Sequence, residues 1–350
     1  TDRQKLLSGK QLSVTPYISE RFEGIRGSST PKDLETARQL VHLYFTSPRR
    51  DSSIFRNIID QSITAIANRN SDPNSVFSDT VAAVLGDYSI RRTGPTVDKL
   101  NQINLDKSLS IYKERFANAG DFTFVFDGNF SVDSIKPLLE EYLGSLPSAP
   151  QKEEARDLKI HIPTGKIEAT AVKGNEPRAT VRLVISGDYH YSPENNMQLT
   201  ALAEILQFRV IDRLREKEGG TYSPGVRVTY NKNPANRYAF TISFGCAPEN
   251  VNKLIADTKE EINKLKTGGA TATDITKFST EEERQYELHL KDNGFWLSWL
   301  SARYEDGEDP ATILKYRELI RRVNPASVKA AANLYLNEKN FIKLLLLPEK

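Results

Sequence analysis

The sequence predicts an α+β protein of two homologous domains, each a mostly antiparallel sheet packed with helices. Segments with strand-like alternation and segments with helical spacing follow one another along the chain. A strand-helix unit occurs twice, at Phe122–Leu143 and at Phe240–Leu265. The spacing of roughly 120 residues is too long for a solenoid repeat and indicates two related domains.

The domain boundary is expected in a stretch that is rich in proline and polar residues. Ser145–Asp157 combines Pro147 and Pro150 with alanines and charges, which is typical of a linker. We therefore predict a first α+β domain over 1–148 and a second over 149–350.

The first half opens with a strand at Leu12–Ile18, where apolar and polar residues alternate. The turn-rich stretch Gly24–Pro31 is expected to interrupt the chain, and its last residues supply the hydroxyl cap and early proline of a helix start. Phe122–Phe126 predicts a buried strand. Apolar residues at helical spacing predict helices over about 33–47, 52–68, from 96 onward, 105–118 and 132–143.

The second half repeats this plan. Ser192-Pro193 is a capped helix start, and the apolar pattern continues from it as one long helix to Gly219. Further helices are predicted over 251–265 and 274–299. The predicted strands are Ala179–Ser186, Gly225–Tyr230, Tyr238–Phe244 and Asn340–Leu347.

Composition excludes several classes of protein. With a net charge of +2 and basic residues matched by acids along the chain, an electrostatic nucleic-acid binder is not expected. No apolar run approaches the roughly 18–20 residues of a membrane-spanning helix. The one cysteine, Cys246, can build neither a disulfide framework nor a thiolate zinc site.

The sequence lacks the common motifs that would allow this chain to catalyse a reaction by itself. None of the four histidines, His42, His161, His190 and His289, has a second histidine three to five residues away. There is no Gly-x-Ser-x-Gly elbow and no glycine-rich phosphate loop.

The run from Arg215 to Tyr222 is the strongest candidate for a functional site. It places a guanidinium at a predicted helix end, then Gly219 and Gly220 as the structural turn that ends the helix, then a phenol. Two such donors could stabilise developing negative charge on a polarised carbonyl. The same residues also fit a charged last helical turn followed by an ordinary strand residue.

Leu214–Pro224 resembles the arginine–tyrosine motif of the pitrilysin/insulinase family of inverted zinc peptidases. The resemblance covers nearly the whole chain: the stretches from Lys10 to Gly24 and from Ser28 to Glu35 resemble the opening of that family's third domain. Asp121–Phe130 is similar to that domain's closing strand, and the chain from Ala179 onward resembles the fourth domain.

The catalytic half of this family carries His-x-x-Glu-His, in which the histidines bind zinc and the glutamate is the general base. The matching register here is Arg38-Gln-Leu-Val-His42. Arg38 would repel Zn²⁺ at a ligand position, and Val41 has no proton to exchange. The resemblance therefore implies no metal and no other cofactor in this chain, with zinc in the catalytic half.

The resemblance further implies a non-catalytic, substrate-binding half that is not proteolytic alone and closes the cleft over an extended peptide. Its partners would be the peptide and the catalytic half, on the same full-length chain or as a separate subunit; the non-methionine start at Thr1 favours an excised C-terminal half. Arg215 would donate to a substrate carbonyl, and Tyr222 would help to stabilise the tetrahedral intermediate. The alternative is a scaffold homologue without any peptidase role, against which the retained Arg215–Tyr222 pair weighs. Bacterial members of this type point to the periplasm or cell envelope, and composition leaves the compartment open.

Overall fold

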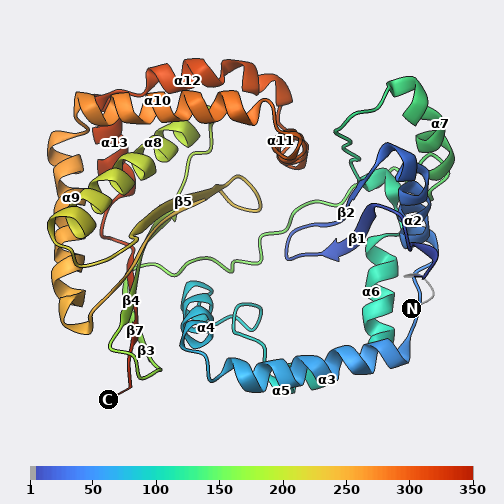
Figure 1. Ribbon diagram of the computed structural model, residues 1–350, viewed down its shortest axis with the longest axis horizontal. Coiled ribbons are helices and arrows are strands. Elements are labelled where there is room, and N and C mark those ends of the chain that lie inside the picture. The colour runs from blue at the N-terminus through green and yellow to red at the C-terminus, as the bar shows by residue number, and fades with distance from the viewer. Residues whose placement is uncertain (1–4, 350) are drawn as a thin grey trace. The chain divides into compact units, whose positions relative to one another are not determined.

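The computed structural model describes residues 5–349 and divides the chain into two compact units (Figure 1). Unit 1 holds Thr1–Ser62, Asp98–Ala155 and Asn293–Glu305, and unit 2 holds Ile63–Val97, Arg156–Asp292 and Asp306–Lys350. Each unit thus takes segments from both halves of the sequence. The predicted domains, 1–148 and 149–350, stay a prediction.

Unit 1 is built on a two-stranded antiparallel hairpin. Strands β1 (Leu12–Ile18) and β2 (Glu23–Ser29) pair from Leu12 opposite Ser29 to Ile18 opposite Glu23. Helix α2 (Leu34–Thr46) packs on this hairpin through Val41 and Phe45. The core of unit 1 consists of Val14, Ala37, Val41, Phe45, Phe116, Ala119 and Leu146.

Two expectations for this region are wrong. Gly24–Pro31 does not interrupt the chain, because most of it is strand β2. Phe122–Phe126 forms no strand; Phe122 instead lies in an aromatic cluster, with ring centroids 4.9 Å from Phe45 and 5.4 Å from Phe116. The alternating phenylalanines of this segment resemble a strand in sequence. In the structure their rings pack together, and the backbone does not pair with a neighbouring strand.

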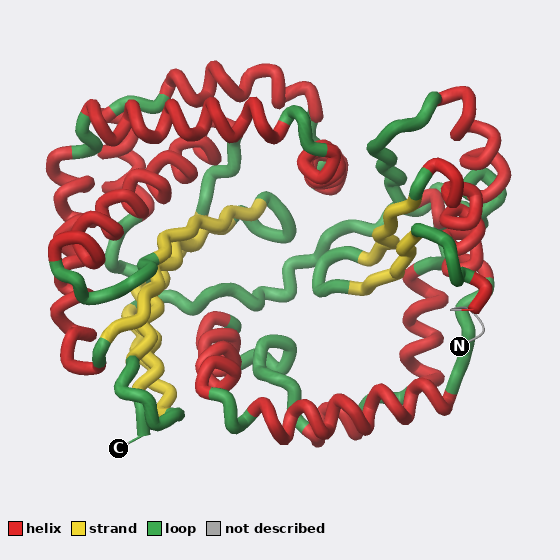
Figure 2. Tube along the Cα trace, viewed as in Figure 1, coloured by secondary structure: helices red, strands yellow, loops and turns green. Residues whose placement is uncertain are grey.

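Unit 2 contains a five-stranded sheet in the order β3-β7-β4-β6-β5. Figure 2 shows its strands in yellow. The β4–β6, β4–β7 and β5–β6 pairs are antiparallel, and only β3–β7 is parallel. The strands are β3 (Lys166–Val172), β4 (Ala179–Asp188), β5 (Gly225–Asn231), β6 (Arg237–Cys246) and β7 (Phe341–Leu347). The prediction of an α+β fold with a mostly antiparallel sheet is confirmed here.

Helices cover both faces of this sheet. On one face, α8 (Pro193–Val210), α9 (Val251–Gly268) and α13 (Pro325–Tyr335) close a large core around Leu183, Phe240 and Leu206. On the other face, α4 (Pro73–Leu85) packs Phe77, Val81 and Val84 against Ala171, Val184, Ile342, Leu344 and Leu346. A helix from the first half of the sequence thus completes the sheet of the second half.

The predicted helix over 274–299 is in fact two helices, α10 (Ala272–His289) and α11 (Asn293–Glu305), with a break at Leu290–Asp292 ahead of Asn293-Gly294. The remaining helices are α3 (Ser52–Arg69), α5 (Val97–Asn101), α6 (Leu105–Arg115), α7 (Val132–Tyr142) and α12 (Tyr316–Arg322). Short helical segments are η1 (Pro31–Asp33), η2 (Ala119–Asp121), η3 (Ile211–Lys217), η4 (Pro248–Asn250) and η5 (Pro310–Lys315). Over residues 5–349, no helix combines the length and the apolar character that crossing a membrane requires.

Candidate functional site

Arg215 and Tyr222 lie on either side of one helix end in unit 2. The Ser192 hydroxyl starts α8 by accepting a hydrogen bond from the Asn195 amide at 3.1 Å. The helix then runs without interruption into the π-helical segment η3, which carries Arg215. Single π-helical turns inside longer helices are frequent at functional sites.

Gly219 and Gly220 end this helix for two different reasons. Gly219 has φ +58°, which most side chains avoid, and its amide donates to the Arg215 carbonyl at 3.1 Å. Gly220 packs so close to α9 that an added Cβ would lie 2.7 Å from Leu254 Cδ2. The chain can therefore reverse at this point and return as β5 within three residues of Tyr222.

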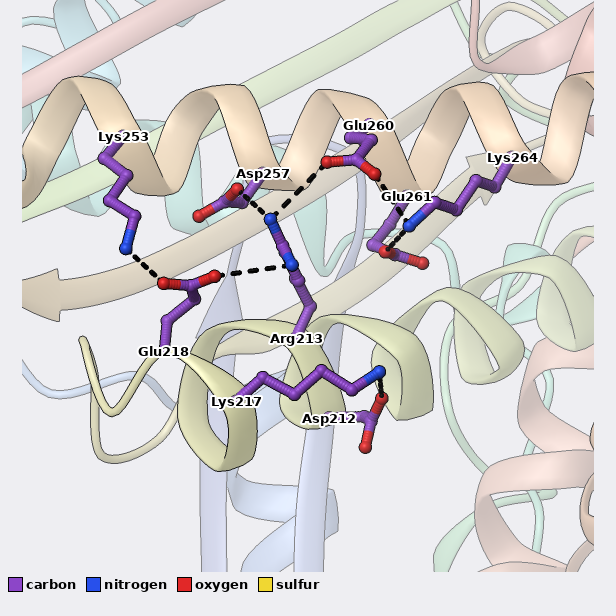
Figure 3. Close-up of polar contacts among 9 residues, drawn as sticks. All are labelled: Asp212, Arg213, Lys217, Glu218, Lys253, Asp257, Glu260, Glu261 and Lys264. Atoms are coloured by element: carbon purple, nitrogen blue, oxygen red, sulfur yellow. Dashed lines mark hydrogen bonds and ion pairs between the residues drawn. The ribbon is translucent and has the colours of Figure 1, made fainter.

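The side chains before and after the candidate arginine anchor the helix end to α9. Leu214 is fully buried in the core. Arg213 pairs with Asp257 at 2.6 Å, with Glu218 at 3.3 Å and with Glu260 at 3.5 Å (Figure 3). Lys253 on α9 also pairs with Glu218, and this contact lowers the pKa of the Glu218 carboxyl. The last turn is thus held to α9 through both Arg213 and Glu218.

Arg215 and Tyr222 themselves point to solvent. The Arg215 side chain is 49% exposed, and it forms an ion pair with the adjacent Glu216 at 3.4 Å. Tyr222 is 84% exposed, the highest value among the large exposed hydrophobic residues of the described chain. The Arg215 guanidinium lies over the Tyr222 ring, 5.5 Å from its centroid. The structure therefore brings together the two residues that the sequence singled out.

This arrangement offers two hydrogen-bond donors on a rigid base. A guanidinium and a phenol can hold a carbonyl oxygen and stabilise negative charge on it. Neither belongs to the histidine and carboxylate groups that usually bind zinc and activate water for hydrolysis. The pair can therefore assist a reaction centre, and the centre itself has to come from another group of residues.

The residues that correspond to the family's zinc motif do not fit a zinc ion. Arg38 lies over the Phe126 ring at 4.0 Å, and burial lowers its pKa to about 10. His42 Nδ1 is 3.0 Å from the Tyr142 carbonyl oxygen, and Val41 is a core residue. Across residues 5–349, no group of three or more His, Cys, Asp or Glu side chains could hold a metal.

A buried carboxyl pair was missed by the sequence reasoning. Glu204 on α8 lies beside Glu282 on α10, and Tyr316 donates a hydrogen bond to Glu282. Burial raises the pKa of Glu204 to about 8, and the charges of Glu282 and Glu281 add to the rise. Because the partners are far apart in sequence, no local spacing could have indicated the pair.

This pair gives the fold a pH dependence that we expect to be measurable. Between its ordinary value of 4.5 and about 8, the folded protein keeps a proton on Glu204 that the unfolded chain has released. Stability therefore falls as pH rises through this window. Glu204→Gln should remove this fall and raise Tm by a few degrees at about pH 9, and by less at about pH 5. Thermal melts of wild type, Glu204→Gln and the control Glu283→Gln, which changes the neighbour of Glu282 on α10, would check this. A wild-type pH profile in all three would contradict it.

Comparison with known proteins gives one family and several long relatives. The family described as the peptidase M16 inactive domain matches residues 102–278. A probable zinc protease PqqL of Haemophilus influenzae is 25% identical over 348 residues, which cover 97% of this chain and 36% of the relative.

Solved structures share the fold over nearly the whole chain. The periplasmic protease PqqL from Escherichia coli matches with a TM-score of 0.84 at 20% identity, covering 99% of this chain and 38% of that one. The ferredoxin protease FusC, solved in complex with Arabidopsis ferredoxin, matches with a TM-score of 0.79 at 19% identity, again over 99% and 38%. The chain therefore spans little more than a third of the length of these proteins.

Proposed function

Because this chain belongs to the peptidase M16 inactive-domain family, we propose that it is the substrate-binding half of a zinc-dependent peptidase. Membership confirms the resemblance drawn from the sequence, and the family is one of zinc proteases. In this proposal the chain closes over an extended peptide and presents Arg215 and Tyr222 to an active site in the catalytic half. It cleaves no peptide alone.

The observation that carries the proposal is the exposure of Arg215 and Tyr222 on an anchored helix end. Large aromatic side chains usually bury their rings, and Tyr222 is 84% exposed beside a cation. Neighbouring charges on the same turn are engaged with α9, so the turn is fixed while its two donors remain available. Such preorganised donors cost little reorganisation when charge develops on a substrate.

Each residue has a separate part in the proposed reaction. The Arg215 guanidinium donates to the carbonyl oxygen of the peptide bond that is cleaved, and this contact strengthens as negative charge grows on that oxygen. The Tyr222 hydroxyl donates to the oxygen on which negative charge grows as the carbonyl becomes tetrahedral. The catalytic half supplies the zinc chemistry when it holds the metal.

The relatives support a protein or peptide substrate and an envelope location. FusC is described as a ferredoxin protease and was solved with a ferredoxin. The Escherichia coli relative is described as periplasmic. We extend both to this chain as part of the proposal: an unfolded polypeptide as substrate, and the periplasm as compartment.

The proposal predicts that hydrolysis requires both halves. This chain alone should leave a quenched fluorogenic peptide intact and hold no stoichiometric zinc by elemental analysis. A catalytic His-x-x-Glu-His half, added in trans or joined in one polypeptide, should bring both zinc and cleavage. As a control, a catalytic half whose motif glutamate is changed to glutamine should bind zinc without cleavage. Cleavage by this chain alone would contradict the proposal. No cleavage with both halves together would contradict it as well and would favour the scaffold role.

A further inference from the structure

The strands β4, β5 and β6 have an open face on the side opposite the large core. Side chains along β6 are alternately buried and half-buried, so one face of this strand lies in the core and the other is accessible. On the accessible face, Thr241, Ser243 and Gly245 have short side chains or none. On the same side of the sheet, α4 packs against β3, β7 and Val184 of β4. The surface above these β6 residues is therefore low and polar.

Two arginines flank the short side chains of β6 on this face. The strand register places Arg182 of β4 opposite Ser243, and Arg227 of β5 opposite Thr241. Side chains of paired residues point to the same face of a sheet. Arg227 is exposed, and Arg182 is half-buried. The two arginines therefore arise on opposite sides of β6 and two residues apart along it.

A third arginine, Arg178, continues this series. It precedes β4, and its guanidinium lies over Gly245, where an added Cβ would be 3.0 Å from Arg178 Nη2. Thr241, Ser243 and Gly245 follow one another at intervals of two residues, which is about 7 Å in a strand. Side chains on one side of an extended peptide have this same interval. The three arginines thus follow the repeat of an extended chain.

These arginines are not neutralised by acidic neighbours. Across residues 5–349, none of the three forms an ion pair, and Asp188 on the same face pairs with Arg237. The Arg182 guanidinium lies over the Phe77 ring at 5.7 Å, and its Nε is buried without a hydrogen-bond acceptor. Burial lowers the pKa of this group. Because a buried donor without an acceptor is costly, an anion that reaches Arg182 relieves that cost.

We propose that this open face, with Arg178, Arg182 and Arg227 around β6, binds an acidic segment of a polypeptide that has carboxylates at alternate positions. Each carboxylate accepts paired hydrogen bonds from one guanidinium. The inference rests on the proposed function and names a feature of its substrate. Arg227 follows Tyr222 by five residues, so their Cα atoms are at most about 18 Å apart and one peptide can span both.

The spacing and the charge balance favour a polypeptide over other anions. A small anion such as phosphate contacts one or two of the arginines, whereas an extended chain with carboxylates at intervals of about 7 Å contacts all three. Nucleic acid is disfavoured because basic and acidic residues are balanced over the whole chain, with a net charge of +2. The hydroxyls of Thr241 and Ser243 supply further donors to carboxylates or carbonyl oxygens of the peptide.

The test measures peptide binding to the full 350-residue chain by fluorescence anisotropy. The probe is a fluorescein-labelled peptide with glutamate at every second position and glycine or serine between. A second peptide has the same residues with the glutamates in one block, and a third has glutamine in place of glutamate. Relative to the alternating peptide, we expect Kd to be weaker by at least about threefold for the block peptide and about tenfold for the glutamine peptide.

Substitutions of the arginines locate the site. Arg182→Gln should weaken Kd about tenfold, because its half-buried guanidinium lacks another acceptor. Arg227→Gln and Arg178→Gln should each weaken Kd about two- to fivefold, as is usual for exposed charge pairs. The matched control, Arg321→Gln, removes an exposed arginine of α12 on the core side of the sheet and should stay within about 1.5-fold of wild type. Circular dichroism checks folding, and the two exposed arginines decide the test if Arg182→Gln fails to fold.

Three outcomes would overturn the proposal. Equal binding of the alternating and block peptides would mean that the spacing of the arginines is not recognised. Equal losses for Arg227→Gln and Arg321→Gln would mean that binding follows net charge alone. Tighter binding of a labelled single-stranded DNA of the same length would assign the face to nucleic acid.

The outcome is separable from that of the proposed function. In the joined enzyme, Arg227→Gln should raise KM for a quenched acidic peptide about two- to fivefold, with kcat and the KM of the glutamine version unchanged. Selective binding of the alternating peptide, without cleavage by the joined halves, would keep the open face and reject the proposed function. Cleavage with equal KM for the acidic and glutamine peptides would reject the open face and keep the proposed function.

Discussion

Arg215→Ala is expected to lower kcat of the joined enzyme by about 10²–10³-fold, the usual loss when one preorganised donor to a developing oxyanion is removed. KM should change much less, because the donor acts mainly on the transition state. The measurement is steady-state hydrolysis of a quenched peptide by the two halves together. Folding should be intact, since the side chain is 49% exposed and contributes little to the core.

Three further variants distinguish the loss of a specific hydrogen-bond donor from the loss of a positive charge on this turn. Lys217→Ala removes another exposed cation of the same turn, paired with Asp212 at 2.8 Å, and should leave kcat unchanged. Tyr222→Phe keeps the ring under the guanidinium but removes the hydroxyl, and should lower kcat by about tenfold or more. The double variant should lose less than the product of the two single losses, because the residues act on one carbonyl. Unchanged kcat in both single variants would remove the pair from the mechanism.

Leu214→Ala is expected to destabilise the chain by about 3 kcal/mol, the usual cost of deleting a fully buried leucine and leaving a cavity. Urea unfolding followed by circular dichroism would measure it, with a lower midpoint and an unchanged slope. Because Leu214 precedes Arg215 on η3, the variant should also raise the mobility of the helix end and lower kcat beyond the effect of lost folded protein.

An exposed residue on the same turn provides the control for this prediction. Lys217→Ala should change stability by less than about 0.5 kcal/mol. If Leu214→Ala were equally mild, the helix end would not depend on its buried anchor, and the argument for a rigid base under Arg215 would fail.

The sequence predicted well those parts of the fold that are fixed by local pattern. The long helix from Ser192 to Gly219, its glycine end and strand β5 all follow from caps and periodicity within a few residues. The place of Arg215 beside Tyr222 follows from the same short stretch, so it could be inferred without tertiary contacts.

Features that depend on distant partners could not be predicted in this way. Asp257 lies 44 residues from Arg213, and nothing in either neighbourhood indicates the ion pair. The Glu204–Glu282 pair is hidden for the same reason. The prediction of a strand at Phe122–Phe126 was wrong because alternating aromatic residues are compatible with a strand and also with an aromatic cluster.

Helix α4 has a consequence for how this chain can be divided. It is encoded before the predicted linker, yet its Phe77, Val81 and Val84 cover one face of a sheet encoded after it. A fragment beginning at residue 149 would leave that face, including Ile342 and Leu344, bare to water and prone to aggregate. The predicted domains 1–148 and 149–350 are therefore not separable modules in this structure, and we expect stable folding of unit 2 to require α4.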